Sequence, residues 1–171
     1  PVFPPLQPGG SYWDLTFLKQ GLLSLQRRGF TSLVKQLTIA SYGYTFDHEI
    51  DWGNGGLEKW PKAMPYFLSE TSEDQRGFSN HEWLFQVVKG TVNLDLPFMI
   101  LGAGVKEPAS SYSPTVHAGV CQGILERLSG TSEKGAVPEY VLCCNFYLLS
   151  AEPDSAAYEH AWFRSQQDVL P

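Results

Sequence analysis

The chain has 171 residues, of which 43% are hydrophobic, 13% aromatic and 18% charged, and its formal net charge is −6. So many aromatic side chains and so few charges exclude a disordered polymer, and the acidic balance argues against nucleic-acid binding through this segment. No stretch approaches the roughly 18 consecutive apolar residues that a membrane-spanning helix needs, so we expect no membrane span. The length fits one globular domain, which we place at residues 11–171, behind a Pro/Gly-rich extended arm at residues 1–10.

The first half of the chain indicates one helix followed by a mixed segment. Leucines spaced three and four residues apart predict a helix over residues 11–29. Residues 31–47 begin with a helical pattern and continue with strand alternation, and a phase slip near Gly43 is what a β-bulge would produce. Residues 52–80 are rich in glycine and proline, and we expect a long irregular segment there.

Two segments of the second half carry strand patterns. Alternation of apolar and polar residues predicts strands over residues 82–104. Residues 139–149 are almost continuously apolar, which predicts a strand buried in the middle of the sheet.

Two further segments of the second half predict helices. Over residues 113–129, Ser113 can cap the helix, Pro114 suits its first position, and Gly130 suits its end. Residues 154–169 predict a terminal amphipathic helix. All these elements together predict an α+β fold, with a mainly antiparallel sheet of about four strands and helices packed on one face.

The cysteines bear on the cellular compartment. Cys143 and Cys144 are adjacent and would point to opposite faces of a strand, so with Cys121 the chain can form at most one ordinary disulfide. The chain also contains no Asn-X-Ser/Thr glycosylation site. Both features favour an intracellular location, although the composition would also suit a secreted or a virion protein.

The segment from Asp47 to Trp52 is the strongest candidate for chemistry. On a strand, Asp47, Glu49 and Asp51 would share one face, beside His48. Crowded carboxylates raise the pKa of one member, which is how general acid and base pairs arise. A solvated acidic strand end is the alternative interpretation, because charged side chains usually lie on the surface.

The string Glu49-Ile50-Asp51 resembles the catalytic string of laminarinase-type glycoside hydrolases. The resemblance implies a carbohydrate substrate and catalytic roles for Glu49 and Asp51. That family places a third acid just downstream, where this chain has Gly53 and Asn54 instead.

Metal ligands and nucleophiles give weaker signals. His117 and Cys121 are four residues apart, so they could share one face of a helix. Two ligands do not complete a metal site, and Cys121 borders an apolar stripe that indicates core packing. We therefore predict no metal and no cofactor.

Three functional hypotheses follow. The first is a non-catalytic binding or assembly module, which associates with itself or with another protein through aromatic-rich surfaces. The second is a small hydrolase that acts on a carbohydrate-like substrate through Glu49 and Asp51, with His48 nearby. The third is a protein that binds a hydrophobic small ligand in a pocket lined by Trp83, Phe85, Phe98, Phe146 and Tyr147. As candidate ligand-binding residues we single out Trp52, Trp60 and Trp83. We favour the first, because the chain lacks a complete catalytic set.

Overall fold

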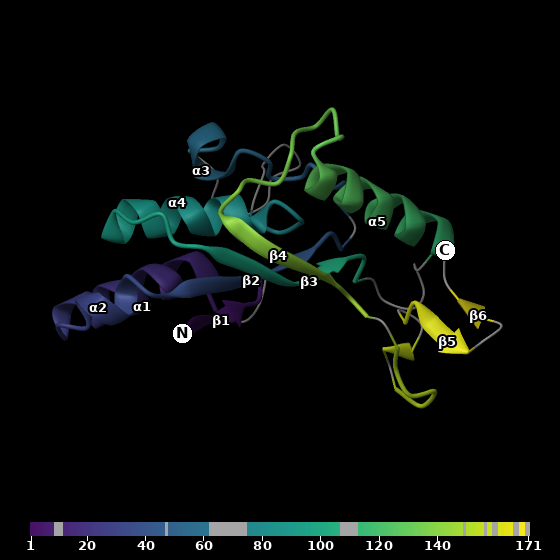
Figure 1. Cartoon of the computed structure of the whole chain (residues 1–171), viewed down its shortest axis with the longest axis horizontal. Coiled ribbons are helices and arrows are strands. Elements are labelled where there is room, and N and C mark those ends of the chain that lie inside the picture. The colour runs from purple at the N-terminus through teal and green to yellow at the C-terminus, as the bar shows by residue number, and fades with distance from the viewer. Residues whose placement is uncertain are drawn as a thin grey trace.

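The computed structural model describes residues 1–8, 12–46, 48–61, 75–106, 113–148, 150–155, 157–158, 161–165 and 168–169. Figure 1 shows the order of its helices and strands, and their bounds are β1 Val2–Leu6, α1 Asp14–Arg27, α2 Thr31–Val34, β2 Thr38–Tyr44, α3 Gly56–Lys59, α4 Asn80–Val92, β3 Phe98–Gly104, α5 Pro114–Ser129, β4 Val141–Phe146, β5 Phe163–Ser165 and β6 Asp168–Val169.

The central feature is a sheet in which β1, β2, β3 and β4 lie side by side in that order, and each neighbouring pair is parallel. Ile39 of β2 is opposite Phe98 of β3, which in turn is opposite Val141 of β4. Parallel neighbours need crossover connections, and α1, α4 and α5 supply them. The fold is therefore α/β, and the prediction of an α+β fold with a mainly antiparallel sheet is wrong.

That error comes from α4, which occupies much of the segment that was predicted to form strands. Its buried side chains include Trp83, Leu84 and Val88, and their spacing places them on one face of a helix. The alternation at residues 92–96 falls at the end of α4 and in the connection to β3, so it marks no strand. Because β2 reaches β3 through this helix instead of through a hairpin, the two strands run in the same direction.

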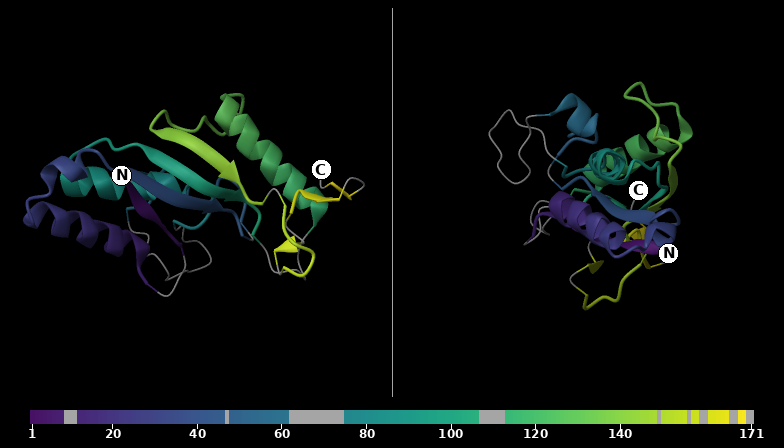
Figure 2. Two further views of the ribbon diagram at one scale, coloured as in Figure 1. Left: turned by 60° about the horizontal axis from the view of Figure 1, so that its bottom comes forward. Right: turned by 90° about the vertical axis from the view of Figure 1, so that its left-hand side faces the viewer.

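The helices α1, α4 and α5 gather on one side of the sheet (Figure 2). Right-handed crossovers between strands laid down in sequence order place each helix on that same side. The larger part of the core lies under α1 and α4, which pack against each other. Its buried residues are Phe3, Leu6, Leu15, Leu18, Leu22, Val34, Leu37, Ile39, Trp83, Leu84, Val88, Leu96 and Phe98.

A smaller cluster lies under α5, where Ile124 packs with Phe78 against Ile100 and Ala103. The prediction of this helix is confirmed. Ser113 is its N-cap residue in an extended conformation, Pro114 opens the first turn, and Gly130 adopts the left-handed conformation after the last turn. The helix predicted over residues 11–29 is likewise confirmed as α1, and the helix-then-strand prediction for residues 31–47 is confirmed as α2 and β2.

The apolar stretch at residues 139–149 does not run through the middle of the sheet, so that prediction is wrong. It forms β4, which is an edge strand of the four-stranded sheet. Leu142 falls in a register shift and is 63% exposed, whereas Cys144 and Phe146 pack against the cluster under α5. One-sided contact with α5 accounts for the apolar character that the sequence pattern attributed to burial on both sides.

The two ends of the chain also differ from the sequence-based expectations. Residues 2–6 of the predicted arm form β1, which pairs with β2. The predicted terminal helix is absent from the described residues between 154 and 169, where β5 and β6 form an antiparallel pair instead. Trp162 packs against Phe146 and His117 with ring-centroid distances of 5.2 and 5.6 Å, and these long-range contacts override the local helical pattern.

Candidate functional site

The carboxyl ends of β2, β3 and β4 lie at one edge of the sheet. In α/β proteins with parallel sheets, ligands bind at that edge, because the loops that leave the strands converge there. Thr45 follows β2, and its backbone N–H donates to the carbonyl of Gly104 at 3.0 Å, so the ends of β2 and β3 are tied together. Tyr147 follows β4 and donates to the carbonyl of Ala103 at 2.9 Å.

Four aromatic residues and one lysine meet at this edge, and we call Tyr42, Tyr44, Phe46, Lys106 and Tyr147 the aromatic shelf. The rings of Tyr42 and Tyr44 are stacked at 13° with centroids 5.1 Å apart. Phe46 and Tyr147 approach Tyr44 edge-on, at 6.0 and 5.4 Å. The Lys106 ammonium lies 4.6 Å from the ring centroid of Tyr44 and 5.9 Å from that of Tyr147, which is within the range of a cation–π interaction.

Tyr44 is the centre of the aromatic shelf. A side chain at Gly102 would place its Cβ 2.7 Å from the Tyr44 hydroxyl, so only glycine lets the phenol lie against the backbone of β3. Burial raises the pKa of Tyr44 to about 12, helped by the neighbouring Tyr42 and Tyr147. The phenol is therefore protonated at neutral pH and is available as a hydrogen-bond donor.

The acidic segment that the sequence singled out lies elsewhere, on the helix side of the sheet. It consists of turns after β2 and not of a strand, so the predicted common strand face does not form. His48 stacks on Trp52 with centroids 4.3 Å apart, Glu49 is exposed, and Asp47 lies outside the described residues. Asp51 forms an ion pair with Lys134 at 2.9 Å.

The electrostatics of Asp51 differ from those of a general acid. The hydrogen bond from Lys134 lowers the pKa of Asp51 below its ordinary value, so this carboxyl is ionised at neutral pH. The catalytic roles predicted for Glu49, Asp51 and His48 stay predictions.

The three predicted ligand-binding tryptophans occupy different environments. Trp83 is fully buried, and its indole N–H donates to the carbonyl of Gly53 at 2.8 Å. Trp60 is half-buried, donates to the carbonyl of Asn54 at 3.0 Å and lies under the Lys59 ammonium. Trp52 is half-buried beside His48. Trp83 and Trp60 both donate to the loop that contains Trp52, but Trp83 has no exposed surface there. The binding roles of the three stay predictions.

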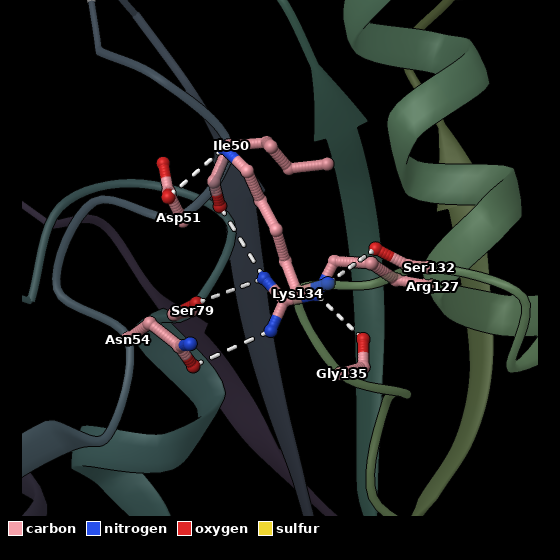
Figure 3. Close-up of polar contacts among 8 residues, drawn as sticks. All are labelled: Ile50, Asp51, Asn54, Ser79, Arg127, Ser132, Lys134 and Gly135. Carbon is pink, nitrogen blue, oxygen red and sulfur yellow. Dashed lines mark hydrogen bonds and ion pairs between the residues drawn. The ribbon is translucent and has the colours of Figure 1, made fainter.

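Beneath the acidic segment lies Arg127 of α5, whose side chain is 2% exposed (Figure 3). Nη1 donates to the Ile50 carbonyl at 3.4 Å and to Ser79 Oγ at 3.3 Å. Nη2 donates to Asn54 Oδ1, and Nε donates to the Gly135 carbonyl, both at 3.3 Å. Burial lowers the pKa of Arg127, but arginine stays charged in proteins. The guanidinium thus fastens the loop after β2 and the start of α4 to the loop before β4.

A cavity of 540 Å³ opens beside this arrangement. It lies between α5, the loop after β2 and the loop before β4, and it is lined by Ile50, Gly123, Glu126, Thr131, Ser132, Glu133 and Lys134. The wall of this cavity contains few apolar residues: of the residues that line it, Ile50 alone has a large apolar side chain. Small-molecule sites are usually lined by apolar and aromatic groups, so the aromatic shelf has the more suitable chemistry.

His117 and Cys121 are brought together as their spacing predicted. Cys121 Sγ lies 3.5 Å from His117 Nε2, and both side chains are buried. Burial raises the pKa of Cys121 to about 11, so the thiol is protonated at neutral pH and is a poor nucleophile.

Within the part of the chain that the structure describes, no cluster of three or more His, Cys, Asp or Glu residues could hold a metal ion. No helix among the described residues has both the length and the apolar character needed to cross a bilayer. Comparisons with protein-family models, with curated proteins and with solved structures found no match to this chain. The candidate function therefore rests on the geometry of the chain itself.

Sequence reasoning missed both the aromatic shelf and the Arg127 arrangement. The alternation of Tyr42, Gly43 and Tyr44 indicated a strand but not its place in the sheet, and Lys106 carried no local signal. Two cues were present in the sequence: tyrosines at the end of a strand, and glycines such as Gly102 at the end of another.

Proposed function

We propose that the protein is an assembly module in which the side of the sheet away from the helices packs against a second copy of the chain. We call this side the open face. Strand register assigns to it Val2, Thr38, Ala40, Tyr42, Tyr44, Met99, Gly102, Gly104 and Cys143. The proposal rests on one observation: these positions carry no charged side chain, in a chain of which 18% is charged, and Lys106 reaches the face only at its carboxyl end, over Tyr44.

Parallel sheets are normally covered on both faces, whereas a solvated sheet face carries polar residues. Ala40, Met99 and Cys143 form a row across three strands of the open face. Ala40 is buried, Met99 and Cys143 are half-buried, and Val2 at the edge of the face is 51% exposed. The long helices α1, α4 and α5 lie on the other side of the sheet (Figure 2). An apolar row of this kind is therefore best covered by a surface of the same chemistry.

A second copy supplies such a surface, because two uncharged rows suit each other and a two-fold axis pairs each residue with its equivalent. Sheets pack about 10 Å apart, which would give a central pair of sheets with helices on both outer sides. Four strands of five to seven residues cover only about 19 by 20 Å. An interface of this size is at the small end of specific contacts, so we expect a weak, micromolar dimer.

Sedimentation velocity over about 2 to 200 µM protein tests the proposal, because that range spans the affinity expected for a small interface. The wild-type chain should shift from monomer towards dimer as concentration rises. Met99→Lys places a charge in the row and should keep the chain monomeric. Val2→Lys adds a charge at the exposed edge and should weaken the dimer even if Met99→Lys impairs folding.

Leu125→Lys is the matched control, because Leu125 is 52% exposed on α5, on the opposite side of the molecule from the open face. This variant should dimerise like the wild type. A wild-type chain that stays monomeric throughout the range, or equal weakening by Leu125→Lys and Met99→Lys, would contradict the proposal.

A further inference from the structure

The aromatic shelf presents hydrogen-bond donors without acceptors to match them. Among the described residues, the Lys106 ammonium contacts the rings of Tyr44 and Tyr147 and has neither an ion pair nor a hydrogen bond. The hydroxyls of Tyr42 and Tyr44 likewise have no hydrogen bond to a described group. One cation and two phenols at the carboxyl edge of the sheet are thus free to contact a ligand.

The shelf is also held in a fixed geometry. Tyr44 is only 6% exposed and is confined between Gly102 and the edges of Phe46 and Tyr147. Tyr42, which is half-buried, stacks on it and offers more of its ring to solvent. A rigid ring costs little conformational entropy when a ligand binds, so stacking on Tyr42 is favourable from the outset.

These features define the ligand by its chemistry. Flat rings select a ligand that has a flat ring of its own, because offset stacking is favourable. A lysine ammonium beside donor hydroxyls selects an acceptor-rich, negatively charged group. A ligand with both features would satisfy the rings and the donors at the same time.

We propose that the aromatic shelf is a binding site for a small organic anion that bears a flat ring, with the ring stacked on Tyr42 and the anionic group held by Lys106 and the Tyr44 hydroxyl. Carboxylate and phosphate groups both meet this description, and the choice of probes separates them. The site shares Tyr42 and Tyr44 with the open face. Binding is therefore measured at protein concentrations at which the chain is monomeric, where it does not depend on the proposed dimer.

Ligand-observed NMR and calorimetry with four probes test the inference. Phenyl phosphate and benzoate carry both a ring and a charge, benzyl alcohol carries only the ring, and inorganic phosphate carries only the charge. We expect at least one of the charged-ring probes to bind roughly 10-fold more tightly than either single-feature probe, which is a difference of about 1.4 kcal/mol. The tighter of these two probes identifies the anionic group, and its binding should weaken as salt is added.

Variants assign the binding to the shelf. Lys106→Gln should lower affinity for the charged-ring probe about 10-fold and leave the weak binding of benzyl alcohol unchanged. Gly102→Ala should displace the Tyr44 ring and weaken binding of the charged-ring probe as well. Lys59→Gln is the matched control, because Lys59 also lies over an aromatic ring, that of Trp60, at 4.9 Å.

Two results would overturn the inference. The first is equal binding of benzyl alcohol and the charged-ring probes, which would show that charge plays no part. The second is an equal loss of affinity in Lys59→Gln and Lys106→Gln, which would place the binding elsewhere. Circular dichroism of each variant separates a lost contact from a lost fold.

Discussion

Replacement of Arg127 by methionine tests whether its hydrogen bonds outweigh the cost of burying its charge. Four hydrogen bonds of 3.3–3.4 Å join the guanidinium to neutral oxygens. Hydrogen bonds to a charged group contribute roughly 1.5–3 kcal/mol at good geometry, but these are long, so we take about 1 kcal/mol each. Methionine removes about 4 kcal/mol of these contacts and recovers about 1–2 kcal/mol of the guanidinium desolvation.

The expected net effect of Arg127→Met is a loss of about 2–3 kcal/mol in the free energy of unfolding. For a chain of this length that corresponds to a fall of about 5–10 °C in Tm. Urea unfolding followed by circular dichroism measures the free energy directly. Lys134→Met is the control: it removes an ion pair whose side chains are 50% and 42% exposed, and it should cost less than about 1 kcal/mol.

The reasoning fails if Arg127→Met is as stable as the wild type or more stable. Some buried charges can be replaced by apolar residues without loss, because their desolvation costs more than their contacts return. That result would mean that the loops around Arg127 are held by packing alone.

Three further predictions concern single groups. Burial lowers the pKa of His81 to about 3, so as pH falls the unfolded chain binds a proton at this histidine before the folded chain does. The free energy of unfolding should therefore be full above about pH 6.5 and decline between about pH 6.5 and 3. Urea unfolding at several pH values should show a smaller decline in His81→Leu. In α5, the added Cβ of Gly119→Ala would contact no other atom, so this variant should be about 0.5–1 kcal/mol more stable than the wild type. Gly130→Ala should be less stable, because Gly130 has a φ of +73°. Thermal melts that rank the two variants in the reverse order would contradict this. Cys121 is buried with a pKa raised to about 11, so mass spectrometry should find it alkylated more slowly than the half-buried Cys143.

Helices were predicted well where their signals are local. Leu15, Leu18 and Leu22 bury one face of α1, and the spacing alone identified that face. For α5, Ser113 at the cap and Gly130 in the left-handed conformation mark the two ends. Caps and turn spacing act over a few residues, so they can be read without knowledge of the rest of the chain.

Strands were predicted less well, because pairing depends on distant residues. The alternation near residue 94 resembled a strand but belongs to the end of α4 and the loop after it. The apolar run of β4 indicated burial on both sides, yet the strand lies at an edge. The terminal helical pattern was overridden by Trp162, which packs against Phe146 and His117.

The sequence by itself determined that this is a folded, aromatic-rich chain with helices at α1 and α5 and a strand at β2, because composition and local periodicity carry that information. Only the tertiary structure decided that the strands are parallel, that Tyr42, Tyr44, Lys106 and Tyr147 meet at one edge, and that Arg127 is buried among neutral oxygens. The residues of each group are separated by tens of positions in the chain. Their meeting follows from the crossover helices and the register of the sheet, which no short sequence window contains.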